Sequence, residues 1–325
     1  MSFTYPLARY RFEFEVSTPL RLPDYAGSTL RGSFGHALRQ LSCATRAKTC
    51  TDCLLAQTCP YTRIFEPVAS GTLVTPPVPY VIEPPQWGAR EYLPGETLAF
   101  NFTLIGKGIE QLPLCIMAWQ RAFLRGVGAG DGIARLSAVR QDNSVIYQPG
   151  LSVAAHTQLM TLSSEDAPQS VTLEFLTPLR LQENGHALPP SKLTPRPLLT
   201  ALMRRVSLLT AQEQLFSQPV AQLAHLADGI EGQVDMEWRD WTRRSSRQQC
   251  TMQLGGCIGH WTLTGDLAPF WNFLRLGVDL HVGKEASFGL GQYRLLLNTE
   301  SCPGKLALRD KPVLRKSLRA FDKHR

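Results

Sequence analysis

The sequence predicts an α+β protein made of two ferredoxin-like domains in tandem. The order strand, helix, strand, strand, helix, strand occurs twice along the chain, which is the split βαβ pattern of that fold. The polar stretch 163–170 separates the two occurrences. Hydrophobic residues make up 43% of the 325 residues and charged ones 19%, enough for two cores of ordinary size. We expect domains over 1–165 and 170–300, followed by a tail over 301–325.

Periodicity justifies each element of the first domain. Residues that alternate between apolar and polar predict strands, and apolar residues three and four apart predict helices. The predicted order is a strand over 9–17, a helix over 28–42, a short strand within the proline-rich 76–85, a strand over 97–105, a helix over 110–126 and a strand over 133–140. Ser28 or Thr29 is placed to cap the first helix. A cysteine-rich insertion follows that helix.

The second domain repeats this order. The predicted elements are a strand over 171–181, a helix over 195–212, a second helical piece over 219–228, a strand through 234–238, another within 248–264, a helix over 267–278 and a strand over 291–297. Thr194 as cap and Pro195 in the first turn mark the start of the first of these helices. Trp238 alternates with Val234 and Met236, which predicts that its side chain faces the core.

Membrane and secretory segments are not expected. The longest near-uniform apolar run, 112–119, is too short to cross a bilayer. The first residues carry scattered charges and no apolar stretch typical of a secretory signal. We therefore expect a cytoplasmic protein whose eight cysteines form no disulfide framework.

The net charge of +7 is unevenly distributed. Residues 305–325 hold eight basic and two acidic side chains, whereas residues 1–304 hold 26 basic and 25 acidic ones. The body is thus nearly neutral and the basicity belongs to the tail. Two interpretations stay open: a solvated chain end, or an extension that binds a polyanion or a partner.

Four cysteines cluster after the first helix: Cys43, Cys50, Cys53 and Cys59. Four thiolates arranged around one CxxC unit suit a tetrahedral zinc site, in which the metal would pin a loop poor in apolar residues. The spacing fits no bacterial ferredoxin sequence, which makes an iron–sulfur cluster less favourable. The alternative is a set of ordinary free thiols. A catalytic metal is not expected, because all four ligands would be protein sulfurs.

A glycine-rich stretch, HVGKEASFGLGQYRL, covers 281–295. It is not a phosphate-binding P-loop, because Val278 and Glu285 replace the glycine and the hydroxyl residue which that motif requires. Bare backbone amides beside one cation can still hold phosphate oxygens. The candidate binding residues are Gly283, Lys284, Ser287, Phe288, Gly289 and Gly291. The alternative is a glycine-rich turn before an edge strand.

Arginines and tryptophans interleave in the segment 235–249. The candidate nucleic-acid-binding arginines are Arg239, Arg243, Arg244 and Arg247. Guanidinium groups bind phosphates through two parallel hydrogen bonds, and aromatic faces stack on bases. In a nearly neutral body this is a local basic patch. The alternative is a charged hairpin tip.

His36 is the strongest candidate for proton transfer. On the predicted first helix it falls on the polar face, beside Gly32 and near Arg39. An exposed glycine on a helix is explained when something approaches the backbone closely, and a histidine there exchanges protons near neutral pH. The alternative is a solvated surface histidine.

The chain resembles the CRISPR-associated RAMP-superfamily endoribonucleases that process CRISPR precursor RNA, the sixth family of Cas proteins. The resemblance covers nearly all of residues 10–297. It rests on YAGSTLRGSFGHALR, the cysteine cluster ending in CPYTRIFEP, PYVIEPP, YLPGETLAFNFTLIG, DWTRRSSRQ and HVGKEASFGLGQY, in this order and spacing.

This resemblance implies two tandem RAMP-type, RRM-like ferredoxin domains and cleavage of CRISPR repeat RNA without a catalytic metal. A histidine of the first helix commonly acts in the family, and His36 matches its place. Tyr25 is the nearest match to the tyrosine or lysine that members often add to the site. The 2′-hydroxyl of RNA would attack the phosphorus, with His36 as base or acid and Arg31 or Arg39 stabilising charge.

Two other functions remain open at this point. One is a non-catalytic subunit that holds crRNA within a CRISPR ribonucleoprotein of other Cas proteins. The other is a zinc-stabilised nucleic-acid-binding module unrelated to CRISPR. None of the three involves a membrane.

Overall fold

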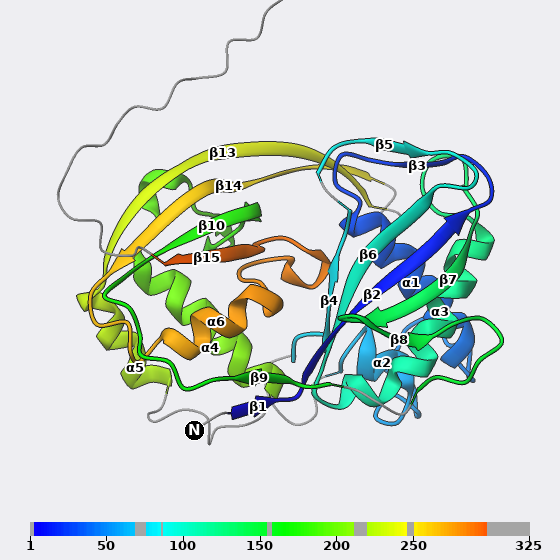
Figure 1. Cartoon of the computed structure of the whole chain (residues 1–325), viewed down its shortest axis with the longest axis horizontal. Helices are drawn as coiled ribbons and strands as arrows, with labels where there is room; N and C mark the ends of the chain where they lie inside the picture. Colours follow the sequence, from blue (N-terminus) through cyan, green and yellow to red (C-terminus); the bar gives the residue numbers. More distant parts are fainter. Residues whose placement is uncertain are drawn as a thin grey trace, which may run out of the picture.

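Two antiparallel sheets, each covered by helices on one side, organise the chain in a computed structural model (Figure 1). The structure describes residues 3–68, 76–85, 87–154, 158–210, 220–245 and 250–297. Arg247 and the predicted basic tail, 301–325, lie outside the described residues.

The first sheet has five strands in the order β4-β6-β2-β7-β8, all antiparallel. The strands are β2 (Leu7–Val16), β4 (Tyr80–Glu83), β6 (Thr97–Ile105), β7 (Ala134–Gln141) and β8 (Ser144–Tyr147). Two helices, α1 (Gly27–Ser42) and α3 (Leu112–Arg125), pack side by side against it. Without β8, the spatial order is second, third, first, fourth strand, which is the ferredoxin-like arrangement.

The second sheet repeats that order as β13-β14-β10-β15, again antiparallel. Its strands are β10 (Ser170–Leu179), β13 (Glu231–Ser245), β14 (Cys250–Thr264) and β15 (Tyr293–Leu297). Its helices are α4 (Pro195–Thr210), α5 (Val220–Leu226) and α6 (Trp271–Leu280). The predicted α+β fold with two tandem ferredoxin-like units is confirmed.

Several short strands and short helices complete the fold. The paired short strands are β1 (Phe3–Tyr5) with β9 (Met160–Leu162), β3 (Leu20–Leu22) with β5 (Arg90–Tyr92), and β11 (Gln182–Glu183) with β12 (His186–Ala187). The short helices are α2 (Pro60–Ile64), η1 (Gly106–Gln111), η2 (Pro190–Lys192), η4 (Ala227–Gly229) and η5 (Ala286–Phe288). Because β1 pairs with β9, the start of the chain is tied to the segment that leads into the second unit.

Each unit buries its own apolar core between sheet and helices. In the first, Phe34 of α1 stacks on Trp119 of α3 with ring centroids 4.8 Å apart, and both are fully buried. In the second, Trp261 and Phe270 are fully buried. Large aromatic side chains supply much of the buried apolar area that holds such cores together.

A long hairpin joins the two units. Strands β13 and β14 pair over fifteen positions and extend from the second unit toward β3 and β5 of the first (Figure 1). Near its far end, Trp241 and Leu254 form a small buried cluster with Tyr25, Phe288 and Leu290. The hairpin therefore fixes the glycine-rich segment against the start of α1.

The prediction for Trp238 was wrong. Its side chain is 38% exposed, whereas Trp241 is the buried tryptophan of this hairpin, at 8%. The ring of Trp238 crosses Gly255 on the neighbouring strand. Its Nε1–H donates to Asp240 at 2.8 Å.

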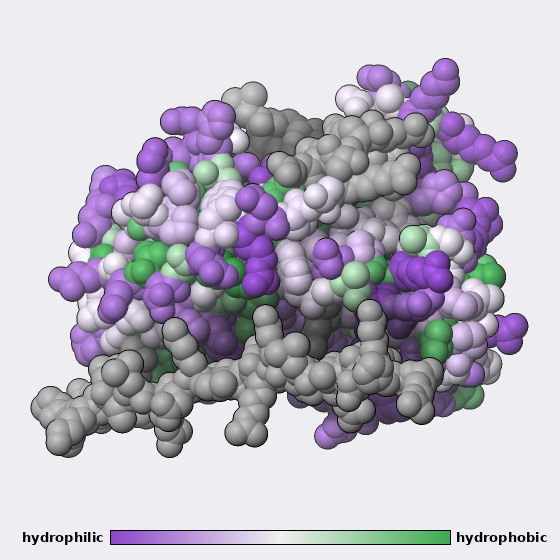
Figure 2. Space-filling view, turned by 90° about the horizontal axis from the view of Figure 1, so that it is seen from above, coloured by the Kyte–Doolittle hydropathy of each residue, from purple (hydrophilic) through white to green (hydrophobic). Residues whose placement is uncertain are grey.

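One face of the molecule shows a mixed, mainly polar surface. In the face seen from above, hydrophobic side chains form small patches between hydrophilic ones (Figure 2). Of the helices that the structure describes, none is long and apolar enough to cross a membrane.

Candidate active site

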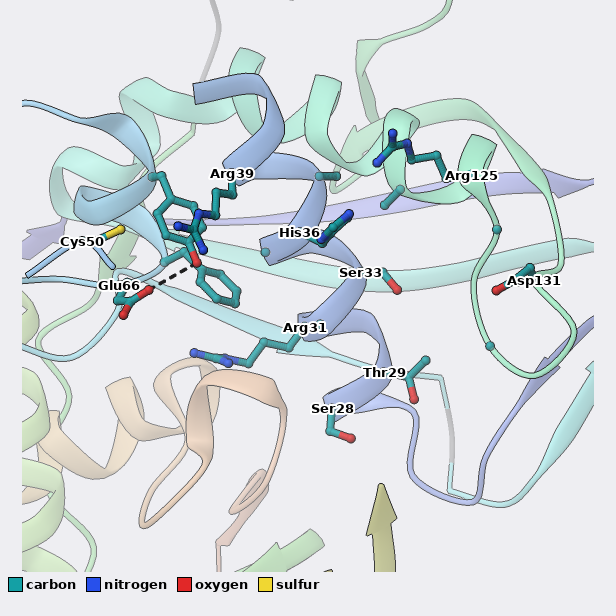
Figure 3. Close-up of a pocket in the computed structure, with 18 of the residues that line it drawn as sticks. Ser28, Thr29, Arg31, Ser33, His36, Arg39, Cys50, Glu66, Arg125 and Asp131 are labelled. Carbon is teal, nitrogen blue, oxygen red and sulfur yellow. Dashed lines mark hydrogen bonds between the residues drawn. The ribbon is translucent and has the colours of Figure 1, made fainter. Parts of the chain in front are cut away.

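A pocket of about 710 Å³ runs along the outer side of α1 (Figure 3). Its floor is α1 itself, from Ser28 to Arg39. One wall is the cysteine-rich insertion with the residues after it, and the opposite wall is the end of α3 with the loop to Asp131. Polar and charged side chains from three segments distant in sequence thus converge on one cavity.

The amphipathic pattern of α1 determines which residues face this pocket. Leu30, Phe34 and Leu38 are fully buried against the sheet. The opposite side of the helix is left to polar residues, among them the exposed His36. The predicted cap was misplaced: α1 begins at Gly27 with Ala26 before it and no side-chain cap, so Ser28 and Thr29 lie within the first turn and line the pocket.

His36 contacts a glutamine one helical turn later. The Nε2 atoms of His36 and Gln40 lie 2.9 Å apart. Arg125, the last residue of α3, donates a hydrogen bond from Nη1 to the Oε1 of Gln40. The structure therefore places the predicted histidine in the pocket and adds two partners that sequence reasoning missed.

The two predicted arginines differ in their contacts. Arg31 stacks on Phe65 at 4.3 Å, and its Nε has no hydrogen-bond partner among the described residues. Arg39 donates to the carbonyl oxygens of Ala47 and Lys48 at 2.5 and 3.1 Å. Arg31 is thus held against Phe65 at the pocket, whereas Arg39 fastens the insertion to α1 and so places Lys48 at the pocket wall.

Tyr25 lies outside the residues that line this pocket. Its side chain is 8% exposed, and its hydroxyl donates to the carbonyl oxygen of Phe288. Its ring packs on Trp87, with centroids 5.0 Å apart. The contacts that the structure gives Tyr25 link the segment before α1 to the glycine-rich segment.

The glycine-rich segment is pinned on several sides. The backbone amide of Lys284 donates to the carbonyl oxygen of Arg180, and Thr177 donates to that of Gly289. Gly291 has φ of 66°, and a Cβ there would lie 1.8 Å from the carbonyl oxygen of Val282. Phe288 is buried, Ser287 half-buried and Lys284 exposed. Its cation is therefore accessible while its backbone is fixed.

A buried polar network lies behind this segment. Glu83, 4% exposed, accepts hydrogen bonds from Arg9 at 2.9 Å and Asn101 at 3.1 Å. Although burial opposes ionisation, Arg9 holds the pKa of Glu83 below its usual value. Burial lowers the pKa of His281 to about 4 and raises that of Asp279 to about 6. Of these groups, Glu83 and His281 are buried, while Asp279 is half-buried and Arg9 is exposed.

The structure describes the arginine patch only in part. The guanidinium of Arg239 lies 5.7 Å from the ring centroid of Trp87, which belongs to the first unit. Arg243 and Arg244 occupy the end of β13, so the hairpin carries them toward the first unit. In Figure 3 this strand points toward Ser28, at the start of the pocket.

The four clustered cysteines surround a second, smaller cavity of about 150 Å³ next to the pocket. Burial raises the pKa of the Cys50 thiol. Burial also opposes ionisation of Cys43, but hydrogen bonds from Arg46 and Thr45 and the nearby Arg39 lower the pKa of its thiol. In the described part of the chain, no three His, Cys, Asp or Glu side chains converge as metal ligands. The predicted zinc site is therefore not seen as a formed coordination sphere.

Two different family models match the two units of the chain. Residues 4–159 match a family model described as an N-terminal domain. Residues 173–293 match the model of the CRISPR-associated endoribonuclease Cas6. The second unit therefore carries a Cas6-type endoribonuclease domain. This match favours an endoribonuclease that acts on CRISPR repeats over the module unrelated to CRISPR.

Solved structures share the fold at low sequence identity. A Cas6 product complex is 18% identical over 90% of this chain and 100% of that one, with a TM-score of 0.54. A Cas6 from Thermus thermophilus is 17% identical over 90% and 100%, with a TM-score of 0.50. A chain of a partial Cas6-RT-Cas1–Cas2 complex is 16% identical over 94% of this chain and 49% of its own length, with a TM-score of 0.54. No curated protein matches the chain.

Three pocket residues were not predicted from the sequence, and only one of them has a sequence signal that could have indicated it. Gln40 lies four residues after His36, so its place on the same helix face follows from spacing alone. Arg125 and Lys48 reach the pocket only through the packing of α3 and the insertion around α1. No local pattern in the sequence indicates that packing.

Proposed function

We propose that the chain cleaves CRISPR repeat RNA without a catalytic metal, by attack of the 2′-hydroxyl on the adjacent phosphorus. A bond forms between O2′ and phosphorus while the bond from phosphorus to O5′ breaks. The proton of the 2′-hydroxyl passes to a base, and the departing O5′ takes a proton from an acid. The products are a mature crRNA with a 2′,3′-cyclic phosphate and a fragment with a 5′-hydroxyl.

The observation that carries this proposal is the position of His36. It is exposed in a pocket lined by the cationic side chains of Arg31, Lys48 and Arg125. Imidazole transfers protons near neutral pH, and cations stabilise the extra charge of the phosphorane. We assign proton transfer to His36 and charge stabilisation to Arg31, with Arg125 and Lys48 added by the structure. Arg39 and Tyr25 act by holding the insertion and the glycine-rich segment in place.

We further propose that RNA binds across the hairpin end and the glycine-rich segment. Arg239, Arg243, Arg244 and Arg247 would hold phosphates beside the segment from Gly283 to Gly291. Because β13 runs toward the start of α1, RNA bound there is led into the pocket. The titles of similar structures name a product complex and an assembly with RT, Cas1 and Cas2, so we infer repeat RNA and other Cas proteins as partners, in the cytoplasm.

The test is incubation with repeat RNA in EDTA, followed by analysis of the product ends. We expect cleavage to a 2′,3′-cyclic phosphate, and we expect His36→Ala to lower the single-turnover rate by at least about 100-fold while affinity changes little. His186→Ala, an exposed histidine on β12, is the matched control. Intact RNA in wild-type reactions would favour the non-catalytic crRNA-holding subunit. A His36→Ala rate within a few-fold of wild type would remove His36 from the mechanism.

We also propose that the clustered cysteines bind one structural zinc. Support comes from their arrangement around a single small cavity and from the hydrogen bonds that favour the thiolate of Cys43. The metal would stabilise the insertion, which leads directly into the short helix α2 and forms one wall of the pocket. Elemental analysis of the purified chain should find about one zinc per molecule. A content near zero in protein of normal stability would contradict the proposal.

A further inference from the structure

Three side chains connect the end of α3 to the ring of His36. Gln40 is the middle one: its amide nitrogen lies 2.9 Å from the Nε2 of His36, and its amide oxygen accepts from Arg125. Helices α1 and α3 pack side by side, which brings Arg125 within reach of α1. The three side chains therefore form a continuous hydrogen-bonded chain.

The chemistry of these groups fixes the direction of both hydrogen bonds. A guanidinium only donates, so the group of Gln40 that faces Arg125 must be its carbonyl oxygen. The amide nitrogen of Gln40 then faces His36, and an amide nitrogen also only donates. The Nε2 of His36 must therefore accept, which requires that it carry no proton. A neutral imidazole with an unprotonated Nε2 has its proton on Nδ1.

We propose that Gln40 and Arg125 are positioning residues that hold His36 as a neutral ring with its proton on Nδ1, and that His36 therefore acts as the base. This inference rests on the function proposed above. A neutral imidazole can accept the proton of the 2′-hydroxyl, whereas the acid role would require a doubly protonated ring. The accepting atom is Nε2, and the hydroxyl, also a donor, takes the place of the Gln40 amide when substrate binds.

The cations of Arg31, Arg39, Lys48 and Arg125 line the same pocket as the ring, together with the carboxylates of Glu66 and Asp131. Arg125 has further N–H groups besides the one used on Gln40, so it can hold a phosphate oxygen while it keeps the amide oriented.

The experiment compares single-turnover cleavage of repeat RNA between pH 5 and 9 for the full chain and three variants. Gln40→Glu places an acceptor beside Nε2 and pairs with Arg125, so it favours a proton on Nε2. We expect a loss of about 100-fold at pH 7 and an acid limb of the rate profile displaced upward by about one pH unit. Gln40→Ala and Arg125→Ala should lose about tenfold, with a smaller upward displacement. RNA affinity should stay within about threefold for both Gln40 variants.

The control is Arg121→Ala, which removes an exposed arginine one turn earlier on α3 and away from the pocket. It should leave the rate and the pH profile unchanged. Gln40→Glu with a wild-type profile, or with a lower rate at an unshifted profile, would overturn the proposal. Failure of the function itself looks different, because the wild-type chain would then leave repeat RNA intact. An inactive His36→Ala together with unaffected Gln40 variants overturns only the positioning role.

Discussion

Two histidines illustrate the difference between the pocket along α1 and the junction, the region behind the glycine-rich segment where the two units meet. Both carry an imidazole, but in opposite surroundings. His36 is exposed on α1 and contacts other polar side chains. His281 is fully buried at the end of α6, with φ of 58°, and its pKa is lowered to about 4. The pocket leaves its titratable and cationic groups accessible. The junction encloses similar groups and uses them to fix the glycine-rich segment.

The glycines of the two regions follow the same division. A Cβ on Gly32, in the pocket, would meet no atom within 4 Å. A Cβ on Gly27 or Gly291, at the junction, would meet a carbonyl oxygen at 2.0 or 1.8 Å. At Gly32 the missing side chain leaves open space in the pocket. At Gly27 and Gly291 it allows two backbone segments to pack closely. Substitutions at these glycines can therefore test directly whether open space or close packing explains each position.

The largest expected effect is that of Gly291→Ala. The new methyl group would collide with the backbone of Val282, and φ of 66° is already unfavourable for alanine. We expect the free energy of unfolding of the second unit to fall by more than about 3 kcal/mol, measured by urea denaturation. Gly95→Ala is the matched control, because it has a similar φ of 87° but open space around it. Equal losses in the two variants would show that the close approach at Gly291 contributes nothing.

The second prediction contrasts anchored cations with the tail. Lys284 sits on a segment whose backbone is fixed by Arg180, and Arg243 and Arg244 sit on β13. Pre-positioned donors lose less entropy on binding, so we expect replacement of all three to abolish the preference for repeat RNA over unrelated RNA.

The matched comparison is deletion of 305–325, which holds most of the net charge. We expect weaker binding mainly at low salt, with the salt slope reduced by about 0.7 to 0.9 per lost phosphate contact and the preference retained. Affinities for both RNAs at two or more salt concentrations provide the measurement. If the deletion erases the preference for repeat RNA while the triple replacement keeps it, the RNA-binding site lies elsewhere than we propose.

Sequence periodicity was sufficient for the fold and less so for the site. The two repeated element orders, and the face of α1 that carries His36, follow from local alternation and helical spacing. The prediction for Trp238 was wrong because alternation along a long strand does not show which of its positions other elements cover. Arg125 and Lys48 were missed because only the packing of distant segments brings them to the pocket. Local pattern predicts a side chain's face, while its neighbours across the fold depend on tertiary packing.

The third prediction sharpens the role of open space in the pocket. Gly32→Ala should raise the stability of α1 by about 1 kcal/mol, because alanine favours the helix and meets no obstacle. That corresponds to a rise in Tm of about 2–4 °C for a domain of this size. If RNA approaches the backbone at this point, cleavage should nevertheless fall about tenfold. Gly229→Ala, also in open space but distant from the pocket, should leave cleavage unchanged. A Gly32→Ala variant with full activity would show that the RNA passes elsewhere.

The smallest expected effect concerns two groups at the junction, the buried His281 and the half-buried Asp279, that titrate in opposite senses. His281 has a pKa of about 4 in the fold against 6.5 when unfolded, so its contribution to stability is lost as pH falls from about 6.5 to 4. Asp279 has a pKa of about 6 against 3.8, so the folded state binds more protons and stability is lost as pH rises through this same range. The two effects oppose each other in the wild type.

Asp279→Asn removes one of them and should expose the other. We expect a higher Tm than wild type at pH 7.5, and a steeper fall of Tm between pH 6.5 and 4.5, measured by differential scanning fluorimetry. Asp166→Asn, at an exposed position in the linker between the units, should follow the wild-type curve. A variant with a lower Tm at pH 7.5 would mean that Arg9, whose Nε lies 3.9 Å from the carboxylate, stabilises the ionised form more than burial opposes it. In that case the junction would hold Asp279 as a charge, and only His281 would make the enclosed network sensitive to acid.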